Sequence, residues 1–152
     1  MTEGTLRFDN VSFAYPSALD RPVLTNVSFE ARKGETIALV GPPGSGKSTI
    51  AHLMPRFYDV TAGKVTIDGQ DIRDVTLSSL RKAVGVVQQD SFLFTTTIEN
   101  NIAYGNPWVR ETRIERAAEY SQLHNYVAGL PAGYHTIVGE RGMSLSGGQR
   151  QR

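Results

Sequence analysis

The residues with the clearest chemistry form a glycine-rich stretch at positions 41–49, with the sequence GPPGSGKST. The stretch matches the pattern G-x-x-x-x-G-K-[ST], and it lies between an apolar run and an amphipathic helical pattern, as a phosphate-binding loop requires. Glycines let backbone N–H groups converge on an anion, and the N-terminus of a helix adds its positive dipole end. The stretch therefore predicts a site for a nucleoside triphosphate.

The positions of this loop have separate predicted roles. The ammonium group of Lys47 is expected on the β- and γ-phosphates, and the hydroxyl of Ser48 is expected to ligate Mg²⁺. The loop does not identify the reaction, because kinases, GTPases and transport ATPases share it. Pro42 and Pro43 have no N–H, so the expected donors are the backbone N–H groups of Gly44, Ser45, Gly46, Lys47, Ser48 and Thr49. Gly41 is also expected among the nucleotide-binding residues.

A second candidate anion site has the sequence LSGGQ at positions 145–149. A hydroxyl and two glycines stand where a helix over residues 149–152 is expected to begin. Such a start presents N–H donors and a positive dipole end to an anion. The alternative is an ordinary helix cap with loop glycines. The predicted binding residues are Ser146, Gly147, Gly148 and Gln149.

The elements before the first loop have strand patterns. Apolar residues alternate over residues 6–9, the phase slips at Asn10, and alternation resumes up to Tyr15, which predicts a strand with a bulge. A second alternating strand over residues 26–31 is expected to pair with it in antiparallel fashion. The run 36–40 is apolar without alternation, which predicts a strand buried on both faces of a parallel sheet.

The elements after the first loop change from mixed to helical. A helix from residue 50 is expected to end near Met54 because Pro55 follows. A strand over 64–69, a short helix over 77–82 and an apolar strand over 84–87 come next. Helices are then expected over 98–103 and 111–127. The chain therefore divides into an α/β lobe, residues 1–88, and a mostly helical lobe, residues 89–152.

Composition excludes several classes of protein. The chain has 152 residues with 16 Lys and Arg against 15 Asp and Glu, so its charge gives no reason to expect nucleic acid as a partner. The absence of cysteine excludes disulfides and thiolate zinc sites. No apolar run is long enough to cross a membrane, so any membrane link is expected to come through a partner.

The pairing of the two glycine motifs resembles the ATP-binding cassette (ABC) family, whose signature sequence is LSGGQ. The resemblance implies an α/β P-loop NTPase (RecA-like) lobe with an antiparallel β-subdomain, followed by a helical signature subdomain. It also implies that Tyr15 stacks on adenine and that Gln89 ligates Mg²⁺ and reports nucleotide state between the lobes. An aromatic residue of the core and a surface glutamine are the alternative interpretations.

Three further stretches resemble ABC exporters: residues 56–59, 98–105 and 136–142. In the last, Glu140 is implied to contact the transmembrane domain of an exporter, although an exposed Glu–Arg pair is the alternative. Ile137 and Trp108 depart from the exporter pattern. The resemblance implies a head-to-tail dimer with a second nucleotide-binding domain, each ATP lying between one phosphate loop and the other signature, at the cytoplasmic face of the membrane.

The sequence stops at Arg152, directly after the signature. The family's acidic Mg²⁺-orienting residue, its general base and its switch histidine are not found upstream. We therefore expect a piece of a longer transporter that binds ATP weakly, hydrolyses it at near-background rates, and exposes apolar surface that favours association. The alternatives are a soluble ABC-type ATPase of nucleic-acid processes, a non-hydrolysing nucleotide-binding fragment, and an unrelated kinase or GTPase.

Overall fold

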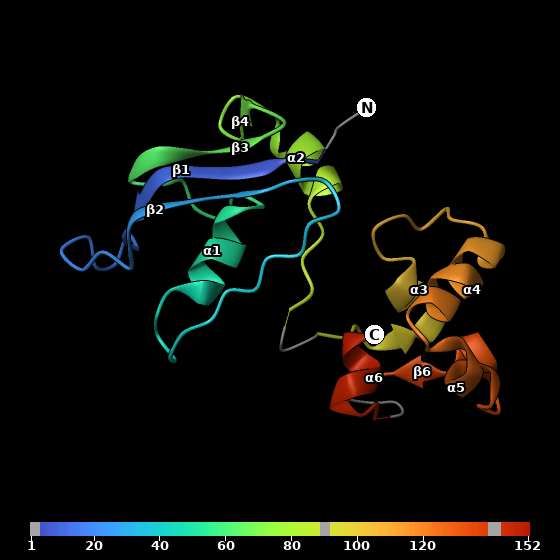
Figure 1. The fold of residues 1–152 in the computed structure, drawn as a ribbon. Coiled ribbons are helices and arrows are strands. Elements are labelled where there is room, and N and C mark those ends of the chain that lie inside the picture. Colours follow the sequence, from blue (N-terminus) through green and yellow to red (C-terminus); the bar gives the residue numbers. More distant parts are fainter. Residues whose placement is uncertain (1–3, 89–91, 140–143) are drawn as a thin grey trace. The chain divides into compact units, whose positions relative to one another are not determined.

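The computed structural model describes residues 4–88, 92–139 and 144–152. The chain separates into two compact units, Met1–Val86 and Val87–Arg152, which we call the first and the second unit. Figure 1 shows the elements of both units along the chain. Each unit is described by itself.

The first unit is built on a four-stranded antiparallel sheet with the order β2-β1-β3-β4. The predicted bulge in the first strand is confirmed, because Asn10 has a φ of 49° and the pairing register shifts between Phe8 and Val11. The slip lets Phe8, Val11 and Phe13 all face the core despite their uneven spacing. The strands are β1 (Leu6–Phe13), β2 (Leu24–Ala31), β3 (Ala62–Ile67) and β4 (Gln70–Asp71).

The bulge requires a glycine on the neighbouring strand. Gly63 has a φ of 77°, and a Cβ atom there would collide with the carbonyl oxygens of Asp9 and Asn10. Only glycine meets both demands, a left-handed backbone and no side chain. The hairpin between β3 and β4 turns through Asp68 and Gly69, whose φ values are also positive, as the Asp-Gly pair predicts.

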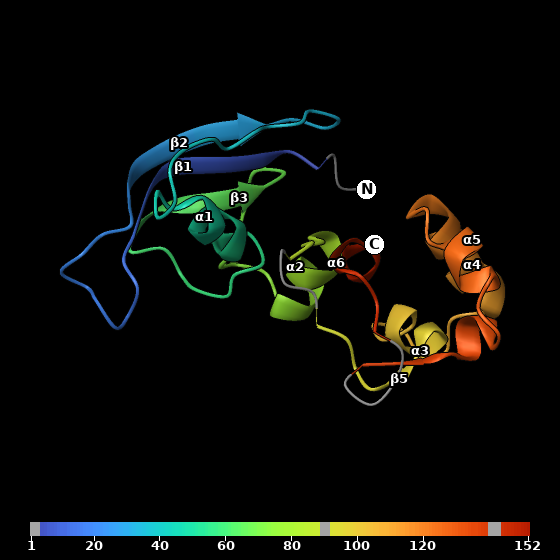
Figure 2. The same cartoon turned by 90° about the horizontal axis from the view of Figure 1, so that it is seen from below.

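Helix α1 (Lys47–Leu53) lies along one face of this sheet, as Figures 1 and 2 show. Its buried side chains, Ile50 and Leu53, join Phe8, Phe13 and Val65 in one hydrophobic core. Helix α2 (Leu77–Ala83) adds Leu80 to the same core and is capped by the hydroxyl of Thr76. The core therefore fixes the helix that follows the glycine-rich loop.

Two of the predicted apolar strands are wrong. Residues 36–40 and 84–87 form no strand in the described part of the chain, and Val40 and Val87 are 89% and 75% exposed. Both segments have the apolar composition of parallel strands, which need hydrogen-bonded neighbours. No described strand pairs with either segment, so composition alone does not make them strands.

The C-terminal end of α1 is held by Arg56. The N–H of Arg56 bonds the carbonyl of Leu53, and the N–H of Phe57 bonds the carbonyl of His52, which closes the helix with Arg56 in the left-handed region at φ 54°. Glycine usually occupies such a position. Arginine is explained at this position by the hydrogen bonds of its side chain to Asp59 and to the backbone of Arg73.

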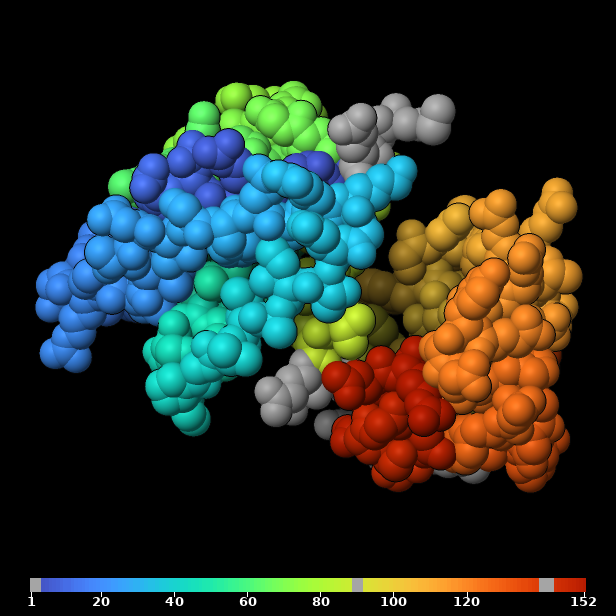
Figure 3. Space-filling model, in the orientation of Figure 1, coloured from blue at the N-terminus to red at the C-terminus, as the bar shows by residue number. Residues whose placement is uncertain are grey.

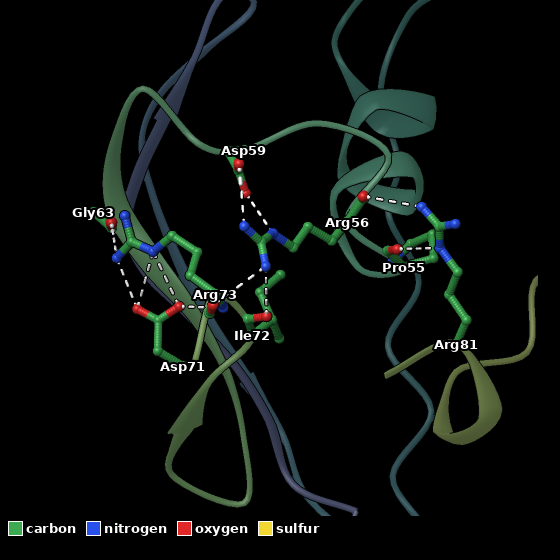
Figure 4. Close-up of polar contacts among 8 residues, drawn as sticks. All are labelled: Pro55, Arg56, Asp59, Gly63, Asp71, Ile72, Arg73 and Arg81. Atoms are coloured by element: carbon green, nitrogen blue, oxygen red, sulfur yellow. Dashed lines mark hydrogen bonds and ion pairs between the residues drawn. The ribbon is translucent and has the colours of Figure 1, made fainter. Parts of the chain in front are cut away.

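The guanidinium of Arg56 bridges two segments, as Figure 4 shows. Its Nε and Nη2 atoms bond the carboxylate of Asp59 at 2.6 and 3.3 Å, and its Nη1 reaches the carbonyl oxygen of Arg73 at 3.2 Å. Arg81 of α2 donates from Nε to the carbonyl of Pro55 at 3.2 Å. The end of α1 is thereby tied both to the strand hairpin and to α2.

The arginines of this network lower the pKa values of their aspartate partners. The hydrogen bond from Arg56 holds the pKa of Asp59 below its ordinary value. In the same way, the hydrogen bond from Arg73 lowers the pKa of Asp71, whose carboxylate it contacts at 2.7 Å. Both carboxylates are therefore favoured in the charged form.

The second unit is mostly helical, around a core that includes Ile98, Ala118, Val127 and Val138. The predicted helix over 111–127 is instead two helices, because Gln122 adopts a φ of 59° between them. The elements are β5 (Thr96–Thr97), α3 (Ile98–Ile102), α4 (Glu111–Tyr120), α5 (His124–Ala128), the 3-10 turn η1 (Gly133–His135), β6 (Ile137–Val138) and α6 (Gly147–Gln151). Within the described residues, no helix has the length and apolar character needed to cross a membrane.

Candidate functional site

The glycine-rich loop enters α1 through Gly46. Gly46 is the N-cap, with a φ of 90°, and a Cβ atom there would lie 2.7 Å from Cδ2 of Leu24 in β2. The loop therefore rests directly on the sheet, and the position admits no side chain. No side chain caps α1, and its first turn holds no acidic residue. The N–H groups of that turn have no partner within the helix and suit an anion.

Lys47 folds back over the loop. Its Nζ donates to the carbonyl oxygens of Gly41 and Pro42, both at 2.8 Å, and lies 3.3 Å from Oγ of Ser45. These acceptors hold the ammonium group above the loop, at the side of the helix start. Phosphate oxygens are stronger acceptors for a cation than neutral carbonyls are. The observed position of Lys47 therefore suits contact with a triphosphate.

The other loop positions are mostly exposed, and Gly44 has a φ of 82° with open space around it. Figure 3 shows the segment between β2 and α1 at the surface of the first unit. One predicted donor is already used, because the N–H of Ser45 bonds the carbonyl of Pro42 at 3.2 Å. Thr49, in contrast, is buried, with 4% exposure, in the first turn of α1.

The loop offers a hydroxyl oxygen of the kind that binds magnesium. Ser48 is exposed at the start of α1, and a hydroxyl is a hard ligand of the kind Mg²⁺ accepts. Among the described residues, no three His, Asp or Glu side chains are grouped to hold a metal by themselves. A Mg²⁺ ion that keeps most of its water and is bound through phosphate oxygens fits this donor set.

Tyr15 follows β1 and is half-buried. Its ring packs edge-on against Phe13 and Tyr58, with centroids 4.9 and 5.2 Å away. Its hydroxyl lies 3.1 Å from Oγ1 of Thr49. The structure thus brings Tyr15 to the phosphate-loop helix. Sequence reasoning assigned Thr49 a backbone role and missed this side-chain contact, for which the 34-residue separation gives no signal.

The LSGGQ motif forms the start of α6 in the second unit. Oγ of Ser146 accepts from the N–H of Gln149 at 3.2 Å, and Oε1 of Gln149 accepts from the N–H of Ser146 at 2.9 Å. This is a capping box, in which two side chains satisfy two backbone donors. Ser146, Gly147 and Gly148 are exposed. The hydroxyl of Ser146 still has its O–H to donate, because the cap uses only its acceptor side.

Two predicted site residues, Gln89 and Glu140, lie outside the described residues. Their assigned roles stay predictions. A cavity of about 360 Å³ in the second unit is lined by residues of α3, α4 and α6. Leu145 and Gln149 of the signature contribute to its lining, whereas Ser146, Gly147 and Gly148 do not.

Known proteins resemble this chain over nearly all its length. Residues 24–152 match the family model described as ABC transporter. The chain is 52% identical over 143 residues to an ATP-dependent lipid A-core flippase of Syntrophus aciditrophicus, covering 94% of this chain and 23% of that protein. It is 51% identical over 149 residues to the mitochondrial iron-sulfur clusters transporter atm1 of Aspergillus fumigatus, covering 98% and 20%.

A solved structure agrees with these relatives. A bacterial Atm1-family ABC exporter with ATP bound has a TM-score of 0.89 to this chain and 49% sequence identity, covering 97% of this chain and 26% of that one. The chain therefore spans about a quarter or less of the length of these relatives.

Proposed function

Because the chain belongs to the ABC transporter family, we propose that it is the nucleotide-binding domain of an exporter and binds ATP with Mg²⁺. The observation that carries the proposal is the loop of residues 41–49, where Lys47 Nζ lies 2.8 Å from two loop carbonyls beside an uncapped helix start. A triphosphate would take the lysine from these carbonyls and accept from the first-turn N–H groups.

The loop residues divide the work by chemistry. The N–H groups of Gly44, Gly46, Lys47, Ser48 and Thr49 bind phosphate oxygens, and the ammonium of Lys47 neutralises the β- and γ-phosphates. Magnesium, when bound with the nucleotide, neutralises phosphate charge, and Ser48 together with Gln89 would hold it. The ring of Tyr15 would receive the adenine base, in a contact worth about 1–3 kcal/mol.

The second unit would serve a second copy of the domain. In the proposed head-to-tail dimer, Ser146, Gly147, Gly148 and Gln149 contact the triphosphate bound to the partner's loop. The exposure of this cap and the free O–H of Ser146 support that role. Gln89 and Glu140 would then transmit nucleotide state to a transmembrane domain at the cytoplasmic face of a membrane, and hydrolysis in the whole protein would drive export.

Binding of ATP and Mg²⁺ to the full chain, measured by calorimetric titration, tests the proposal. Lys47→Ala removes the charged contact to the phosphates, and we expect its Kd to rise roughly 10- to 100-fold. Lys33→Ala is the matched control, because Lys33 is an exposed lysine of the same unit away from the loop. Equal affinities for Lys47→Ala and Lys33→Ala, or no binding by the unaltered chain at millimolar ATP, would refute the proposal.

A further inference from the structure

A side-chain hydrogen bond connects two parts of the proposed nucleotide site. The hydroxyl of Tyr15 and Oγ1 of Thr49 are 3.1 Å apart. Tyr15 follows β1, whereas Thr49 lies in the first turn of α1, directly after the lysine and serine of the phosphate loop. The bond therefore joins the ring assigned to the base with the helix assigned to the phosphates.

The bond is a directional contact of the Tyr15 side chain with α1. The rings of Phe13 and Tyr58 also pack edge-on against it, at interplanar angles of 80° and 90°, but neither ring belongs to α1. The neighbouring backbone is also held, because the N–H of Ala14 bonds Oγ1 of Thr61 at 3.1 Å. Ring packing and the neighbouring backbone hydrogen bond limit where the Tyr15 ring lies. The hydrogen bond to Thr49 fixes the position of the Tyr15 hydroxyl relative to α1.

A hydroxyl at position 49 needs this partner. Thr49 is 4% exposed, and a buried hydroxyl without a hydrogen bond is unfavourable compared with a methyl group of the same shape. Valine would fill the same volume without a polar atom. The hydrogen bond to Tyr15, rather than packing, therefore explains why position 49 has a hydroxyl group.

We propose that Thr49 is a positioning residue, whose side-chain hydroxyl holds the Tyr15 ring in register with the phosphate loop. The inference rests on the proposed function, in which Tyr15 receives the base. It adds to the backbone role of Thr49 a second role through its side chain. Loss of the hydroxyl should then weaken binding of a ligand with a base and leave binding of a bare triphosphate chain unchanged.

Two ligands separate these roles: ATP with Mg²⁺, and inorganic tripolyphosphate with Mg²⁺, each titrated into the full chain. We expect Thr49→Val to weaken ATP binding roughly threefold to tenfold, the range of one hydrogen bond, and tripolyphosphate binding less than about twofold. Tyr15→Phe keeps the ring and removes the same bond, so it should match Thr49→Val. The double variant should be no weaker than either single variant.

Thr49→Ser controls for packing, because it keeps the hydroxyl and removes the methyl group. Its ratio of ATP to tripolyphosphate affinity should stay close to that of the unaltered chain. Equal losses for both ligands in Thr49→Val would overturn the proposal, because Thr49 would then act on the phosphates themselves. Additive losses in the double variant, or unchanged ATP binding by Thr49→Val, would also overturn it.

Tyr15→Ala distinguishes this failure from failure of the proposed function. If Tyr15→Ala weakens ATP binding but Thr49→Val does not, the base-binding role stands and the positioning role falls. If Tyr15→Ala binds ATP as well as the unaltered chain does, the base-binding role falls and the positioning role falls with it.

Discussion

The two glycine motifs each lie at a helix N-terminus, but they leave it in opposite states. At α1 the N-cap is Gly46, and no side chain makes a capping hydrogen bond to the helix start. At α6 the side chains of Ser146 and Gln149 already satisfy two backbone donors. The first start is open to a ligand that brings many acceptors, whereas the second is complete and offers a hydroxyl proton and exposed glycines.

The glycines of the two motifs serve different purposes. Gly46 combines a left-handed φ with contact to Leu24, so its lack of a side chain is a requirement of the fold. Among the described residues, nothing lies within 4 Å of a Cβ built at Gly147 or Gly148, which both belong to α6. Contacts with those residues therefore do not require glycine at the two positions. In the proposed dimer, these glycines would leave the surface above them clear for the partner's triphosphate.

The largest expected effect is that of Gly46→Ala. A left-handed alanine costs about 1–2 kcal/mol and overpacking against Leu24 adds about 1–3 kcal/mol, so we expect about 2–5 kcal/mol of lost stability in urea unfolding. Gly44→Ala is the control, because Gly44 has a similar φ and open space. Equal unfolding free energies for the two variants would contradict the role given to the contact with Leu24.

Ser146→Ala should have an intermediate effect, confined to α6. Loss of the cap should cost the helix about 1 kcal/mol, seen as faster hydrogen exchange in a peptide covering residues 144–152. Ser144→Ala is the matched control, because Ser144 is exposed and lies outside the capping box. Unchanged exchange in Ser146→Ala would mean that the cap does not support α6.

Gly148→Ala should have a smaller effect of the opposite sign. Alanine is favoured over glycine inside a helix by about 0.5–1 kcal/mol, and the position has space for it. The same exchange measurement should therefore show slower exchange in α6. Slower exchange in Gly148→Ala, together with destabilisation in Gly46→Ala, would establish that the fold requires glycine at position 46 and not at position 148. Faster exchange in Gly148→Ala would contradict this difference.

The smallest expected effect is a dependence of stability on pH. It should arise from the arginine–aspartate network that holds the end of α1, the helix after the first motif. The pKa values of Asp59 and Asp71 are lowered by their arginine partners, so their stabilising effect is full above their ordinary pKa of 3.8 and is lost as pH falls through the lower folded values. Ser146 and Gln149 do not titrate. Thermal melting of the first unit should therefore shift downward as acid is added.

Single substitutions can show which of the two carboxylates contributes more to the acid dependence of the melting temperature. The Asp71 side chain is 16% exposed and that of Asp59 is 57% exposed, so solvent screens Asp59 more. Asp71→Asn should therefore flatten the acid dependence of the melting temperature more than Asp59→Asn does. The reverse order, or no change in slope for either variant, would contradict the assignment.

The features that sequence predicted correctly are those with local signals. The slip of alternation at Asn10 indicated the bulge, Pro55 indicated the end of α1, and the pair Asp68-Gly69 indicated a turn. Each signal acts within a few residues through backbone dihedrals or a missing N–H. The glycine-rich loop belongs to the same class, which is why its place before α1 could be predicted.

The features that sequence missed depend on distant neighbours. The run 36–40 has a strand composition, but a strand also needs a paired neighbour, which composition cannot supply. The bond between Tyr15 and Thr49 spans 34 positions, and Arg56 reaches a carbonyl 17 positions away. The break at Gln122 interrupts a good helical pattern through one left-handed residue, which no residue type there announces.

The bulge at Asn10 and Gly63 on the neighbouring strand together fix the pairing register of β1 and β3. The bulge directs two carbonyl oxygens at one position of β3, and only Gly63 leaves room for them. A slip of β3 by one residue in either direction would put Ala62 or Lys64 against those oxygens. The two strands therefore pair in a single register, and folding intermediates in which β1 and β3 are mispaired are disfavoured before the rest of the core forms.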